Sequence, residues 1–355
     1  MEIYTRKTVD KVKRLYGEYR KFLYNKVLEL PCEILEIPAP ENTPGARARF
    51  NTVMPESGWK EVKPGDKWGG EFSYAWIRSK YAVGKETEGK KLLLRPDTGL
   101  VEGLLFVDGK AGGIFDLCPD IPSDFRLHEV QPLTDNAKAG DTFEIAIECY
   151  AGHRVLGTRP YDNGEVDKWS FYPADNLRTF NSLDIVVCDE AVAEFLILHR
   201  TVTQIIDCYE ENMAQHAAAI NAFLEIFKIL PLRPQEAASD WRPALERANG
   251  ILRGVTSRKS AEGEEAGFVG LIGHSHLDTA WLWPVRETVH KAARTFSNAL
   301  RLMEVYPDYH FIQSSVLYID WMKKYYPDIY EGIKQRTAQG RWEPNGGAWV
   351  ECDNN

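Results

Sequence analysis

The spacing of apolar residues changes several times along the chain. It is helical over residues 10–31, and Pro31 predicts the end of this N-terminal helix. From about 45 to 185, short apolar runs alternate with Gly, Pro and Asp, which is typical of antiparallel strands joined by turns. Asp108-Gly109 predicts a tight hairpin, because both residues tolerate positive φ angles. We therefore expect a β-sandwich over 45–185.

Helical spacing returns over 190–229, and a further helix is expected after Ser239 and Asp240, which can cap it. Residues 257–267 are polar and charged and contain Gly, as in an exposed linker. We place a domain boundary there.

A strand–helix alternation follows the linker. A buried strand is expected to end in Gly-His-Ser-His-Leu-Asp, a helix to span 285–306, and a second strand to span 310–315. A helical segment broken at Pro327 and a third strand after Gly340 complete the pattern, which predicts a parallel sheet with its active site at the C-terminal strand ends.

The predicted fold is multidomain α+β: an N-terminal helix and β-sandwich, a helical connector, and the start of a (β/α) barrel-like domain. The expected divisions are a helical segment at 1–44, a β-sandwich accessory domain at 45–185, a helical connector at 186–256, and an incomplete β/α domain at 268–355.

The composition of the chain limits the classes of binding partner that we expect. The net charge of −9 gives no reason to expect nucleic acid, and the ten Trp residues mildly favour a sugar ligand. The N-terminus lacks the apolar stretch of a signal peptide, and no run is long enough to span a bilayer, so we expect a cytoplasmic protein without a membrane partner.

Candidate chemistry lies in the segment Gly-His-Ser-His-Leu-Asp. His274, His276 and Asp278 alternate, so in an extended chain their side chains share one face. Imidazole and carboxylate are both good zinc ligands, but a catalytic zinc normally takes three protein ligands. The motif alone is weak, and a capped strand end would explain it as well.

The segment GHSHLDTAWLWPVRET resembles the metal-binding opening of the family 38 glycoside hydrolases, which are α-mannosidases. The later segments FIQSS, YYPDIYEGIK and GRWEPNGGAWVECD resemble the same family in order and spacing, and the likeness is to its cytosolic or vacuolar subgroup. By position the resemblance implies that His276 and Asp278 bind one zinc ion and that Trp281 lines the sugar site. His274 is expected to pack beside them.

The resemblance implies a zinc-dependent retaining hydrolase that removes terminal α-mannose from oligosaccharides. We expect the nucleophile, the acid/base and the remaining zinc ligands to lie downstream, so that this N-terminal portion contains no catalytic residue and is inactive alone. No role is given to Glu351 or Asp353. A homo-oligomer or the remaining catalytic segment is the expected protein partner.

Two alternatives stay open. The chain could be a non-catalytic carbohydrate-binding or interaction fragment. His274-x-His276 also resembles the opening of metal-dependent amidohydrolases, which need further His residues on later strands; only His290 and His310 follow.

Overall fold

The computed structural model divides the chain into two compact units, Met1–Val27 with Val186–Val269 and Leu28–Ile185 with Gly270–Asn355. The structure describes residues 2–37, 53–70, 73–117, 128–152, 177–257, 269–279, 283 and 285–350.

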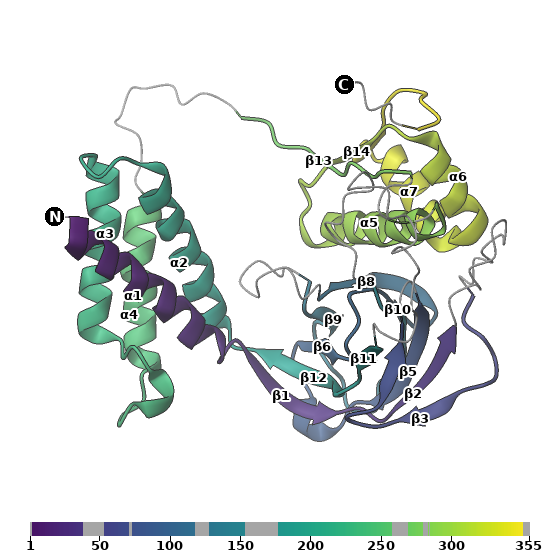
Figure 1. Cartoon of the computed structure of the whole chain (residues 1–355), viewed down its shortest axis with the longest axis horizontal. Helices are drawn as coiled ribbons and strands as arrows, with labels where there is room; N and C mark the ends of the chain where they lie inside the picture. Colours follow the sequence, from purple (N-terminus) through teal and green to yellow (C-terminus); the bar gives the residue numbers. More distant parts are fainter. Residues whose placement is uncertain are drawn as a thin grey trace, which may run out of the picture. The chain divides into compact units, whose positions relative to one another are not determined.

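In the described part of the first unit, four helices share one apolar core (Figure 1). The core is formed by residues at helical spacing on every helix, among them Leu15, Phe195, Phe223 and Leu245, each with no exposed surface. The N-terminal helix, predicted as part of a separate segment, thus packs with the helices of the predicted connector. The helices are α1 (Glu2–Arg20), α2 (Glu190–Cys208), α3 (Ala214–Ile229) and α4 (Arg242–Thr256), with a 3-10 turn η5 (Pro234–Glu236) before α4.

The predicted helix over 10–31 is wrong in its second half. Helix α1 ends at Arg20, and residues Tyr24–Glu29 form strand β1, which pairs with β12 (Ser182–Cys188). Pairing with a distant strand here outweighs the local helical spacing of apolar residues. Asp240 does support α4, because its Oδ1 accepts a hydrogen bond from the backbone N–H of Arg242 at 3.1 Å.

The second unit begins with antiparallel sheets, as predicted, and we call strands β1 to β12 the two-sheet region. One sheet has the strand order β1-β12-β6-β9 and the other β3-β2-β5-β10-β7-β8, while β4 and β11 form a short ribbon. The hairpin at Asp108-Gly109 is confirmed, with φ angles of 52° and 77°. The remaining strands are β2 (Cys32–Ile37), β3 (Lys60–Val62), β4 (Lys67–Gly69), β5 (Tyr74–Ala82), β6 (Leu92–Asp97), β7 (Glu102–Val107), β8 (Lys110–Asp116), β9 (Gln131–Thr134), β10 (Thr142–Tyr150) and β11 (Leu177–Thr179), with a 3-10 turn η1 (Lys85–Thr87).

The chain then continues as a short α/β segment. Strands β13 (Gly273–His274), β14 (Phe311–Gln313) and β15 (Trp342–Pro344) pair in that order and in parallel, as predicted. The helices between them are α5 (Val285–Val305), α6 (Val316–Tyr325) and α7 (Pro327–Ala338), and the predicted break at Pro327 is confirmed. Three parallel strands do not show closure, so the barrel stays a prediction.

The predicted buried strand before His274 is wrong. Only Gly273 and His274 are paired, and Leu271 is 89% exposed. The apolar run therefore lacks a covering layer among the residues that the structure describes.

Helix α5 lies against the six-stranded sheet (Figure 1). Because strand side chains alternate, Leu104 on β7 and Ile114 on β8 share the face that meets Phe296 on α5 in one core cluster. Glu102, two residues before Leu104, lies on the same face. The two-sheet region thus supports the α/β segment directly. None of the described helices is both long and apolar enough to cross a membrane.

Candidate functional site

His276 and Asp278 come together just beyond the carboxyl end of β13. The Nε2 atom of His276 lies 3.5 Å from Oδ1 of Asp278, and the side chains are 50% and 31% exposed. The spacing of two residues places both on one side of the extended segment, as the sequence predicts. The pair is open to solvent and to a ligand.

The separation of these two atoms fits neighbouring ligands of a tetrahedral zinc ion. Zinc bonds of about 2.0–2.1 Å meeting at the tetrahedral angle place two ligand atoms about 3.3 Å apart. Within the described part of the chain, no group of three or more His, Cys, Asp or Glu side chains is placed to hold a metal. Among the described residues, this pair thus supplies two side chains of the types that bind zinc, fewer than the three protein ligands of a catalytic site.

The structure describes only some of the other residues that the sequence analysis singled out. His274 is exposed, and its Nδ1 lies 3.2 Å from the carbonyl oxygen of Ile312 on β14, so the ring packs on the neighbouring strand. Trp281, Glu351 and Asp353 lie outside the described residues. The histidines that the amidohydrolase alternative needs point elsewhere: His310 contacts the carbonyl of Asp308, and His290 is buried on α5.

Two buried hydroxyl groups hold the backbone around Asp278. Thr288 Oγ1 on α5 donates to the carbonyl oxygens of Asp278, at 3.3 Å, and Thr279. Tyr318 on α6 donates its hydroxyl to the carbonyl of Leu277 and lies 3.1 Å from Thr279 Oγ1. Neither Thr288 nor Tyr318 has exposed surface.

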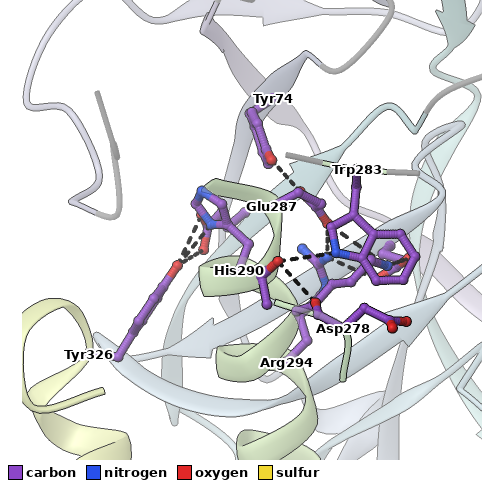
Figure 2. A network of polar contacts seen from close by, with 11 residues as sticks. Tyr74, Asp278, Trp283, Glu287, His290, Arg294 and Tyr326 are labelled. Atoms are coloured by element: carbon purple, nitrogen blue, oxygen red, sulfur yellow. Dashed lines mark hydrogen bonds and ion pairs between the residues drawn. The ribbon is translucent and has the colours of Figure 1, made fainter. Parts of the chain in front are cut away.

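The first turns of α5 are tied to the two-sheet region by charged groups (Figure 2). Glu287, with no exposed surface, accepts hydrogen bonds from Tyr74 on β5 and from Arg294. Arg294 lies 2.8 Å from Glu102 on β7, and Lys291 lies 2.6 Å from the other oxygen of Glu102. We call these five residues the α5 charge cluster.

A neighbouring polar group adds a second buried carboxylate, that of Glu148. His290 Nδ1 lies 2.5 Å from Glu148 on β10, and Tyr326 at the start of α7 donates to Glu148 at 3.1 Å. Figure 2 shows His290 and Tyr326 meeting at this point. Helices α5 and α7 and strand β10 therefore meet through polar contacts beside the apolar core.

The electrostatics of the α5 charge cluster favour its ionised form. Burial by itself would raise the pKa of Glu102, but the positive charges of Arg294 and Lys291 outweigh it and lower the pKa to about 2. Burial and the neighbouring Glu287 charge raise the pKa of Tyr74 well above its ordinary value, so this hydroxyl stays a donor.

Sequence reasoning missed the α5 charge cluster. A signal was available, because Glu287, Lys291 and Arg294 recur at spacings of four and three residues, which places them along one side of the helix. Charged residues on a buried helix face need partners of opposite charge. One such partner, Glu102, lies about 190 positions before Lys291 in the sequence.

Comparison with known proteins supports the motif. Residues 267–355 match the glycosyl hydrolases family 38 N-terminal domain. Alpha-mannosidase G of Dictyostelium discoideum is 25% identical over 98% of this chain, and human Alpha-mannosidase 2C1 is 44% identical over 32% of it. The chain spans 30% of the length of the first relative and 11% of the second.

Among solved structures, a β-glucuronidase from Ruminococcus gnavus is 13% identical, with a TM-score of 0.28 over 47% of this chain and 29% of its own. We draw no conclusion from so low a score. The family match instead covers the strand-end pair, the helix that supports it and all three parallel strands. Residues 267–355 are therefore similar to part of the glycosyl hydrolases family 38 N-terminal domain.

Proposed function

We propose that this chain is part of a zinc-dependent retaining α-mannosidase that removes terminal α-mannose from oligosaccharides. The observation that carries the proposal is the His276–Asp278 pair, 3.5 Å apart at a strand end inside the segment that matches family 38. The alpha-mannosidases among the relatives supply the substrate class.

His276 and Asp278 would hold the metal through Nε2 and Oδ1, the two atoms that already face each other. When bound, zinc supplies a Lewis acid that grips sugar hydroxyl groups. Trp281 remains the proposed sugar contact on the strength of the family motif. The retaining route also needs a nucleophile and an acid/base carboxyl group about 5 Å apart, and we assign neither role to a residue of this chain.

The test combines metal binding with turnover. We expect the purified 355-residue chain to bind zinc weakly, with a dissociation constant above the micromolar range, because two ligands lack much of the binding free energy of a full site. We also expect the chain to leave an aryl α-mannoside intact, because no nucleophile or acid/base is assigned within it. Calorimetric titration with zinc should lose its signal in His276→Ala and in Asp278→Asn. Glu144→Gln, an exposed carboxylate on β10, is the matched control and should leave binding unchanged.

Zinc bound with full strength in both site variants would refute the assignment of the ligands. Turnover by this chain that disappears in His276→Ala would support the metal site but refute the expected inactivity. A non-catalytic sugar-binding role would appear as mannoside binding that does not depend on His276 or on zinc.

A further inference from the structure

The described residues around Asp278 are held by a connected set of hydrogen bonds. The indole N–H of Trp283 donates to Thr288 Oγ1 at 3.1 Å, and the Thr288 hydroxyl in turn donates to the carbonyl oxygens of Asp278 and Thr279. Tyr318 donates to Leu277 and is close enough to accept from Thr279. Each hydroxyl can therefore donate and accept at once, which fixes its direction.

Trp283 and Thr288 are in turn connected to the two-sheet region. The ammonium group of Lys291 lies 4.7 Å from the centre of the Trp283 ring and 2.6 Å from Glu102 Oε1 on β7. Glu287, the residue before Thr288, is bound by Tyr74 on β5. A continuous series of contacts thus runs from Glu102 through Lys291, Trp283 and Thr288 to Asp278.

A purely stabilising interface would not need these charges. Burying Glu287 and Arg294 costs desolvation free energy, and apolar residues of similar volume often stabilise a fold equally well. Charged groups with several directed partners instead restrict α5 to one rotation and one height against the sheet. That restriction fixes where Thr288 presents its hydroxyl.

We propose that Thr288 and Tyr318 are positioning residues for Asp278, and that the two-sheet region sets the position of Thr288 through Glu102 and Lys291. The inference rests on the proposed function only in treating Asp278 as a metal ligand. It assigns to the two-sheet region the task of holding a loop of the family 38 segment in its metal-binding geometry.

Variants of the full chain test the positioning role. Thr288→Val removes the hydroxyl at nearly constant volume, Thr288→Ser keeps it, and Tyr318→Phe removes the second hydroxyl. Thr337→Val is the control, because the Thr337 hydroxyl likewise donates to a backbone carbonyl, that of Ile333 within α7, away from the loop. Hydrogen exchange of the amides around 277–279, zinc titration and the melting temperature are measured for each.

We expect Thr288→Val and Tyr318→Phe each to speed exchange of the loop amides and to weaken zinc binding by about tenfold, the effect of losing one buried hydrogen bond. Thr288→Ser should restore both quantities, and Thr337→Val should change neither. Glu102→Gln, three contacts beyond Thr288, should weaken zinc binding by about threefold, because coupling through packed groups is smaller.

The outcomes separate the two proposals. A wild-type chain that binds no zinc refutes the proposed metal site, while loop exchange still decides the positioning role. Loop exchange unchanged in Thr288→Val, or zinc affinity unchanged while exchange rises, refutes positioning by Thr288. Zinc affinity unchanged in Glu102→Gln refutes the part played by the two-sheet region.

Discussion

Replacing Glu102 by Gln tests the electrostatic account of the α5 charge cluster. The substitution keeps the shape of the side chain and removes one negative charge. Arg294 and Lys291 are then left with Glu287 as their single carboxylate within the cluster. The folded state should lose stability, and the loss should depend on pH.

The magnitude follows from the pKa of Glu102, which falls from an ordinary value of 4.5 to about 2. A folded-state pKa below the unfolded one favours folding above pH 4.5, and this contribution is lost as the pH falls through 2. The difference corresponds to about 3 kcal/mol. Because 25% of the side chain is exposed, solvent screening reduces the expected contribution to about 2–3 kcal/mol at neutral pH.

Urea unfolding of wild type and Glu102→Gln, followed by Trp fluorescence at about pH 7, 5 and 3, measures the contribution. The stability difference should shrink to about 1 kcal/mol near pH 3, because Glu102 is then mostly protonated in the unfolded state while it is still mostly ionised in the folded state. Glu144→Gln removes an exposed carboxylate of the same sheet and should change stability little. Equal stability of wild type and Glu102→Gln at neutral pH, or a difference independent of pH, would refute the reasoning.

Two further predictions concern the cores. Burial lowers the pKa of His199 to about 4 from an ordinary 6.5, so the unfolded state takes up the proton first and the helical unit should lose stability as the pH falls through this range. His199→Gln should flatten that dependence in thermal melts followed by circular dichroism, and an unchanged slope would contradict it. Phe296→Ala removes a buried ring 5.2 Å from the ring of Trp342 and should cost about 3–5 kcal/mol in urea unfolding. A loss below about 1 kcal/mol would mean that this core is not tightly packed.

Local features of the fold were predictable because neighbouring residues determine them. The hairpin at Asp108-Gly109 depends on two residues that tolerate positive φ, and the break at Pro327 on one missing N–H group. The meeting of His276 and Asp278 follows from their spacing in an extended segment.

Features that depend on distant partners were not predictable. Residues Tyr24–Glu29 carry apolar positions at helical spacing and yet form a strand, because β12 pairs with them. Trp349 is 58% exposed although its side chain is apolar. Its apolar character was evident, but whether another layer covers it depends on tertiary packing.

The same division applies to the candidate site. The amino-acid sequence alone determined the residue types and the spacing of the His276–Asp278 pair. Only the tertiary structure decided that Glu102 and Tyr74 meet α5 and that Thr288 meets the Asp278 loop, since these contacts require a defined strand register and a defined helix rotation. The type of a side chain indicates the kind of partner that it requires, whereas the identity of that partner depends on how segments far apart in the sequence pack together.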